Sequence, residues 1–141
     1  MEDILIVKQK LNASIEKVWD ALTDKKAMKK WYFDIPNFTL ELNRSFTFYE
    51  PGTEKKFLHQ CEVLEVIHNQ KLSHSWSYPE FSHEKTIVTW ELIPDDEGTQ
   101  LMLKHTGLEK FATLDDAFSR ENFEKGWKTI IGKSLREFVE A

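Results

Sequence analysis

The sequence predicts an α+β domain in which a curved antiparallel sheet of about six to seven strands grips a long C-terminal helix. Residues from Phe38 to Thr106 form short β-rich runs separated by turn residues, and such short links favour an antiparallel meander. The final stretch, "FEKGWKTIIGKSLREFVEA", instead has apolar residues at spacings of three and four, which indicates an amphipathic helix.

The first elements expected are one strand and two short helices. Ile4–Leu11 is β-rich and mixes apolar with polar residues, so it predicts a strand that joins an edge of the sheet. Ser14 can cap a helix that contains "VWDALTD", and Asp24 can cap a second short helix that ends near Trp31.

The middle of the chain predicts strands joined by turns. The candidates are Thr39–Leu42, Ser45–Tyr49, Phe57–Ile67, Lys71–Trp76, Lys85–Ile93 and Gln100–His105. After a connection of about a dozen residues, Ser119 can cap a terminal helix that reaches about Val139.

Strand alternation predicts which side chains face this helix. The more apolar sets are Phe46, Phe48, Leu72, His74, Trp76, Val88, Trp90, Leu92, Leu101, Leu103 and His105. The strand Phe57–Ile67 is ambiguous, because Cys61 and Val63 lie on one face whereas Leu64 and Val66 lie on the other.

Small residues interrupt the apolar face of the terminal helix. At about 100° per residue, Ser134 falls near the middle of this face, Gly126 at its edge and Gly132 on the opposite side. A glycine within a helix costs about 1 kcal/mol relative to alanine. We interpret Ser134 and Gly126 as the border of a cavity; the alternative is a close approach of the sheet at these positions.

Composition excludes several classes of protein. The formal net charge of −5 argues against general nucleic-acid binding, and no apolar run is long enough to span a bilayer. With a single cysteine, Cys61, the chain can form no internal disulfide. We expect one domain over residues 1–141 and, because no secretory signal is visible, a cytoplasmic location.

Motifs for catalysis, metals and cofactors are not found in the sequence. It contains no phosphate-binding glycine loop and no Gly-x-Ser-x-Gly elbow, and its five histidines form no metal-type cluster. We therefore assign no catalytic residue, no metal and no cofactor.

Several segments together resemble the activator of heat-shock-protein-90 ATPase homologue family, in the START-like, helix-grip superfamily (SRPBCC). They are "SIEKVWDALTDKKAMKKWY", "VLEVIHNQKLSHSW", "VTWELIPDDEGTQLMLKHTGL" and "FEKGWKTIIGKSL". His105 and Gly107 match the family's H-x-G after the last strand, and Gly126 and Trp127 match its helix entry. The resemblance implies a deep cavity between sheet and helix. The eukaryotic co-chaperones of the family carry an additional N-terminal domain, which 141 residues leave no room for, so chaperone stimulation is not the favoured interpretation.

The lining predicted for this space is mostly apolar with a few polar groups, as in small-molecule sites. The candidate ligand-binding residues are His74, Trp76, Trp90, Leu103, His105, Phe123, Trp127, Ile130, Ile131 and Ser134. We expect the mouth at "WYFDIPNF", "SYPEFSH" and "EKFATLDDAF".

The favoured function is non-catalytic binding of a small hydrophobic or aromatic molecule, a class that includes lipids. One alternative is a protein-interaction domain with a chaperone or another protein as partner. The other is a cyclase-like or hydrolase-like enzyme that uses His74 or His105 as general acid–base.

Overall fold

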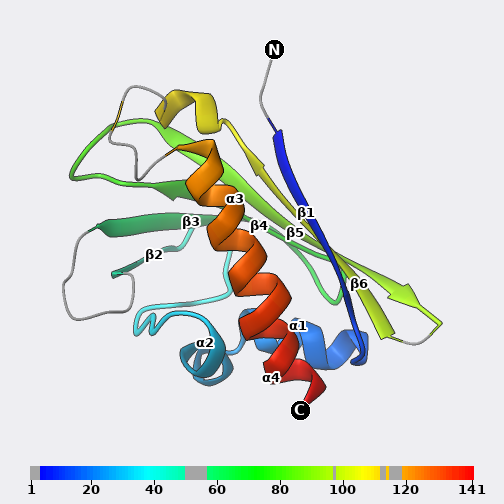
Figure 1. Ribbon diagram of the computed structural model, residues 1–141. Coiled ribbons are helices and arrows are strands. Elements are labelled where there is room, and N and C mark those ends of the chain that lie inside the picture. The colour runs from blue at the N-terminus through cyan, green and yellow to red at the C-terminus, as the bar shows by residue number, and fades with distance from the viewer. Residues whose placement is uncertain (1–3, 50–56, 97, 112–113, 115–118) are drawn as a thin grey trace.

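The computed structural model describes residues 4–49, 57–96, 98–111, 114 and 119–141, and it has the predicted α+β fold (Figure 1). In chain order the elements are β1 (Ile4–Leu11), α1 (Ile15–Thr23), α2 (Lys25–Trp31), β2 (Ser45–Tyr49), β3 (Leu58–Ile67), β4 (Lys71–Ser77), β5 (Lys85–Asp95), β6 (Gly98–Thr106), the 3-10 helix η1 (Leu108–Phe111) and a long terminal helix. The side chains of Ser14 and Asp24 accept hydrogen bonds from the backbone of α1 and α2, as expected of helix caps.

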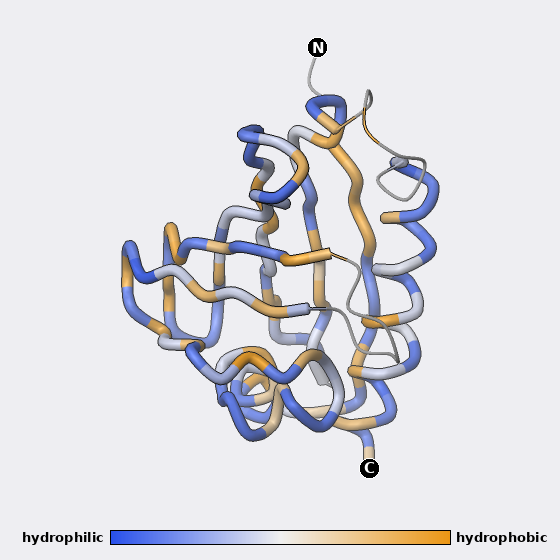
Figure 2. The backbone as a smooth tube through the Cα atoms, turned by 90° about the vertical axis from the view of Figure 1, so that its left-hand side faces the viewer, coloured by the Kyte–Doolittle hydropathy of each residue, from blue (hydrophilic) through white to orange (hydrophobic). Residues whose placement is uncertain are grey.

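The strands of the described residues belong to one antiparallel sheet in the order β1-β6-β5-β4-β3-β2. The run from β2 to β6 is the predicted meander, and β1 joins its β6 edge, with Ile4 opposite Thr106 and Leu11 opposite Thr99. The sheet curves around the terminal helix, which crosses its concave side in Figure 1. In the view turned by 90°, the terminal helix runs along one side of the sheet (Figure 2).

The prediction of a strand at Thr39–Leu42 is wrong, because this segment is not a strand and ends in a turn. Asn43 has a left-handed backbone (φ 67°), and the Arg44 amide donates to the Glu41 carbonyl at 3.2 Å. Asparagine tolerates this conformation better than most residues. Pairing with β3 begins only here, where the Asn43 amide donates to the Val63 carbonyl at 2.8 Å.

The structure also shows which face of the ambiguous strand, β3, points into the core. In β3, Cys61 and Val63 are fully buried, whereas Leu64 is 41% exposed next to a register shift between Val63 and Glu65. The inward-facing residues predicted for the other strands are all buried, so the alternation assigned their faces correctly.

The terminal helix has three parts: α3 (Arg120–Thr129), a π-helical segment (Ile130–Leu135) and α4 (Arg136–Glu140). In the π segment the Arg136 amide donates to the Ile131 carbonyl, five residues back. This wider turn changes the phase of the helix, so the buried residue near its end is Val139, while Phe138 is only half-buried.

The same change of phase corrects the place predicted for Gly132. A Cβ added at Gly132 would lie 3.3 Å from Oε1 of Gln9, so the residue faces β1 and does not lie on the side opposite the core. Of the predicted packing face Phe123–Trp127–Ile130–Ile131, Phe123, Trp127 and Ile131 are buried against the concave side of the sheet as expected, whereas Ile130 is only half-buried.

Candidate functional site

His105, at the inner end of β6, lies in a continuous chain of hydrogen bonds that runs from Trp127 to the Trp76 carbonyl. The Trp127 indole Nε1 donates to Nδ1 of His105 at 3.1 Å, so Nδ1 is an acceptor. Nε2 therefore carries the proton and donates to Oγ1 of Thr86 at 2.8 Å, and this hydroxyl donates to the Trp76 carbonyl at 2.8 Å. The chain joins the terminal helix to three strands and fixes one neutral tautomer of His105.

His74 is held in the same way on β4. The Trp90 indole Nε1 donates to Nε2 of His74 at 3.1 Å, and Nδ1 donates to the Ser75 carbonyl at 2.9 Å. Both ring nitrogens of each histidine are thus used within the fold.

Burial keeps these histidines neutral. Desolvation lowers the pKa of His74 to about 4, and desolvation together with the nearby His74 lowers that of His105 to about 3. A general acid–base needs a free nitrogen within reach of a substrate and a pKa near the working pH. The arrangement therefore disfavours the enzyme alternative based on His74 or His105. Burial also raises the pKa of the Cys61 thiol, which keeps it protonated.

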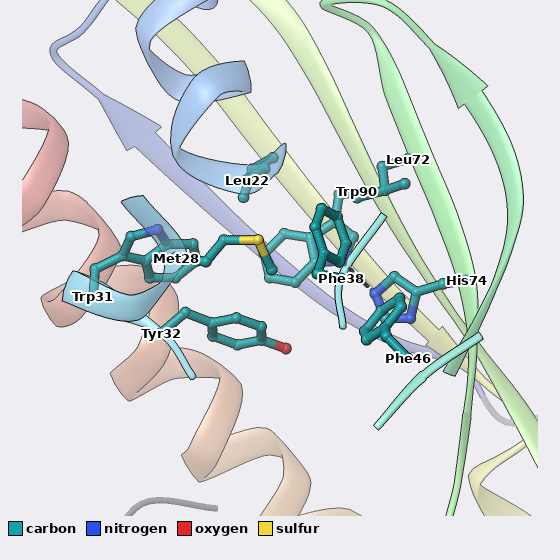
Figure 3. Close-up of a pocket in the computed structure, with 9 residues that line it drawn as sticks. All are labelled: Leu22, Met28, Trp31, Tyr32, Phe38, Phe46, Leu72, His74 and Trp90. Carbon is teal, nitrogen blue, oxygen red and sulfur yellow. Dashed lines mark hydrogen bonds between the residues drawn. The ribbon is translucent and has the colours of Figure 1, made fainter. Parts of the chain in front are cut away.

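Side chains fill most of the space between sheet and helix. What is left under α2 is an inner pocket of about 10 Å³, shown in Figure 3. Its lining consists of Leu22, Met28, Trp31, Tyr32, Phe38, Phe46, Leu72, His74 and Trp90. A single water needs roughly this volume, so the deep cavity implied by the family resemblance is here reduced to a very small space.

A larger space opens between the end of α2 and the terminal helix. This cleft measures about 530 Å³. Its lining consists of Trp31, Tyr32, Phe33, Lys125, Gly126, Thr129, Ile130 and Ser134. A Cβ added at Gly126 would meet nothing within 4 Å, so this glycine borders open space. The volume falls within the range of small-molecule sites.

A side pocket of about 170 Å³ adjoins the cleft and shares Phe33, Gly126 and Ile130 with it. The rest of its lining is His59, Trp76, Tyr78, Asn122, Phe123 and Trp127. The Phe33 ring stacks on Phe48, and Phe48 stacks on His59, each with 4.6 Å between ring centroids. These stacked rings connect the segment after α2 to β2 and β3, and the outer two, Phe33 and His59, line the side pocket.

The predicted site residues fall into three groups. Trp76, Phe123, Trp127, Ile130 and Ser134 line the cleft or the side pocket. His74 and Trp90 line the inner pocket. Leu103, His105 and Ile131 are fully buried and line none of these three spaces.

The site residues that sequence reasoning left out are chiefly Trp31, Tyr32 and Phe33. They belong to the expected mouth. The sequence could have indicated them, because three consecutive aromatic side chains cannot all point to one face of a short helix, so at least one of them must lie outside the core. Of the other expected mouth segments, Tyr78 lines the side pocket, whereas residues 112–113 and 115–118 lie outside the described residues.

The described residues also bear on two other features, a metal site and a membrane-spanning helix. Among them, no group of three or more His, Cys, Asp or Glu side chains could hold a metal ion. In the same part of the chain, no helix combines the length and apolar character needed to cross a membrane.

Fold and site together define a START-like helix-grip domain: a curved antiparallel sheet, a long helix on its concave side, and an aromatic cleft between that helix and the end of α2. The chain belongs to the family described as Activator of Hsp90 ATPase homolog 1-like protein, whose model matches residues 12–140. His105, Gly107, Gly126 and Trp127 lie within this match. Gly107 has a φ of +90°, which favours glycine after the last strand.

Solved structures with the same fold come from several bacteria. Protein BH1534 of Bacillus halodurans is 26% identical, with 97% of this chain and 96% of that chain covered and a TM-score of 0.75. Protein CV1439 of Chromobacterium violaceum is 20% identical (99% of each chain, TM-score 0.80). The Aha1 dimer of Colwellia psychrerythraea is 17% identical (98% and 96%, TM-score 0.76). No curated protein matches the sequence.

Proposed function

We propose that this protein binds a small hydrophobic or aromatic molecule, without catalysis, in the cleft and side pocket beside the terminal helix. The observation that carries the proposal is the open space at Gly126, where an added Cβ would meet nothing within 4 Å although the residue is half-buried and lines both the cleft and the side pocket. A glycine in a helix costs about 1 kcal/mol relative to alanine, so a small residue here needs a reason.

The lining supports the ligand class. Trp31, Tyr32 and Phe33 form one side of the cleft, and Ile130 faces them from the helix. Aromatic walls of this kind suit flat apolar molecules, which can stack at 4.5–7 Å between ring centroids. Lys125 is the only charged residue among the described lining of the cleft and side pocket, so the buried part of the ligand should be uncharged.

The test is a thermal-shift screen with naphthalene, indole and flavone derivatives, followed by titration of any compound that stabilises the protein. A ligand at 100 times its Kd adds about 2.7 kcal/mol, which corresponds to a rise in Tm of roughly 5–10 °C for a domain of this size. The variant Gly126→Leu should keep or raise the stability of the free protein, because it fills open space and removes a helix glycine.

The same variant should abolish the ligand-induced shift. Lys133→Leu is the matched control, because this residue is exposed on the same helix and lines none of the three spaces. Compounds that stabilise Gly126→Leu as strongly as the unmodified protein would contradict binding in the cleft. A complete lack of stabilising compounds would contradict the proposal as a whole.

A second candidate function, protein interaction, has one specific observation in its favour. Ile4, Ile6 and Ile87 are 44%, 48% and 42% exposed on the outer face of the sheet, and Ile4 and Ile87 both pair with Thr106 of β6. Exposed apolar groups near one another can mark an interaction site. The ATPase rate of an Hsp90 chaperone, measured with this protein and with its Ile87→Lys variant, tests this candidate.

A further inference from the structure

The side chain of Tyr32 ends in a hydroxyl that is buried but has no hydrogen-bond partner in the described part of the chain. The other N and O atoms of the inner-pocket side chains all have partners. Nε1 of Trp31 donates to the Ala21 carbonyl at 2.8 Å, and the nitrogens of His74 and Trp90 are used as described above. The Tyr32 hydroxyl is therefore the exception in an otherwise satisfied lining.

The position of Tyr32 connects two spaces. Its ring lies against Trp31 and Phe33, with 4.9 Å and 4.3 Å between ring centroids, and it lines both the cleft and the inner pocket. Figure 3 shows the hydroxyl directed away from α2, toward the side of the inner pocket where Phe46 and His74 lie. A molecule that enters past Tyr32 from the cleft would thus meet this hydroxyl at its buried end.

We propose that the Tyr32 hydroxyl donates a hydrogen bond to an uncharged carbonyl oxygen at the buried end of the ligand, which makes the preferred ligand an aromatic ketone, ester or amide. This inference rests on the proposed function and adds the polar group that the site selects. The inner pocket, at about 10 Å³, has room for one such atom.

The chemistry of the pocket supports an uncharged acceptor. None of the residues that line the inner pocket is an Asp, Glu, Lys or Arg, and an unpaired charge there would be costly to bury. Burial raises the pKa of Tyr32 well above 10, so the phenol keeps its proton and stays a donor. A site with a buried group of this kind rejects analogues that leave it unpaired.

The experiment compares two probes of nearly the same shape, 2-acetylnaphthalene and 2-isopropenylnaphthalene, which differ in C=O against C=CH2. Kd is measured for the unmodified protein, for Tyr32→Phe and for Tyr49→Phe. Tyr49 lines none of the three spaces and is the matched control. The preference for the ketone should fall about 10-fold in Tyr32→Phe, the effect of one hydrogen bond of this type, and stay unchanged in Tyr49→Phe.

A second readout needs no ligand. Because Tyr32→Phe removes an unsatisfied buried hydroxyl, the urea midpoint of the free protein should stay equal or rise. A lower midpoint would show that the hydroxyl already has a structural partner, such as a fixed water, and would overturn the inference.

Different results would contradict the hydrogen bond from Tyr32 and the binding of a ligand in the cleft. If both probes bind and Tyr32→Phe keeps the full preference for the ketone, the inference is overturned while binding in the cleft stands. If neither probe binds the unmodified protein at its solubility limit, cleft binding of flat aromatic molecules fails and the inference fails with it.

Discussion

Ser134 offers the sharpest test of the cleft, because two explanations of its small size predict stability changes of opposite sign. It lies in the π segment, is half-buried and lines the cleft. Leucine in its place adds apolar carbons, each worth up to about 0.8 kcal/mol when fully buried. With half of the side chain covered, Ser134→Leu should leave the free energy of unfolding unchanged or raise it by roughly 1 kcal/mol.

A close approach of the sheet at Ser134 gives the opposite result. The larger side chain would then overpack the core and lower the free energy of unfolding by about 1–3 kcal/mol. Urea unfolding at pH 7.5, followed by tryptophan fluorescence, separates the two outcomes. Lys133→Leu is the control, since it adds the same side chain one residue away on the exposed side.

Binding gives the second half of this test. The leucine at position 134 would project into the cleft, so Ser134→Leu should weaken binding of 2-isopropenylnaphthalene at least about 10-fold, equivalent to 1.4 kcal/mol. A strongly destabilised variant would refute the cavity explanation at this position. A stable variant that binds the probe normally would place the ligand elsewhere.

The remaining predictions concern the buried histidines. The pKa values of His59 and His74 are lowered to about 4 and that of His105 to about 3, below the usual 6.5, because burial disfavours the charged form. The unfolded chain takes up protons first, so urea unfolding should show full stability above about pH 6.5 and a loss of about 1–2 kcal/mol per histidine by pH 5. Thr86→Val removes the partner of Nε2 of His105 and the hydroxyl that donates to the Trp76 carbonyl, and the same measurement should show a loss of about 2–4 kcal/mol. His105→Gln should keep the affinity for 2-isopropenylnaphthalene within a few-fold, since His105 lines none of the three spaces; a loss of about 10-fold or more would contradict its structural role.

The sequence predicted the fold well where one face of an element had to be buried. Alternation in β4, β5 and β6 gave the inward residues, and Ser119 was expected as the cap of the terminal helix, where its hydroxyl accepts from the Asn122 amide at 3.2 Å. The missed turn at Asn43 shows the limit, because an apolar residue such as Leu42 can be 59% exposed next to a left-handed backbone.

The site was predicted less completely, and the reason is packing. Alternation tells which residues point inward, but it does not tell whether space is left between them. His105 and Ile131 point inward and are packed solid, whereas Gly126 and Ser134 border open space. The π segment adds a second difficulty, since a projection at about 100° per residue fails once the turn widens, as it does before Gly132.

The place of β1 in the sheet has a consequence for folding kinetics. Every pair from β2 to β6 joins neighbours in the chain, but β1 pairs with β6 across residues 12–97. At about 5–20 residues per second, synthesis of these residues takes roughly 4–17 s, during which β1 has no partner strand. The Asn12 amide, just after β1, also bonds to the Glu140 carboxylate at 2.9 Å, so the terminal helix completes the same end of the sheet. Because such distant contacts form slowly, docking of β1 should be a late step of folding, after the local hairpins of the meander.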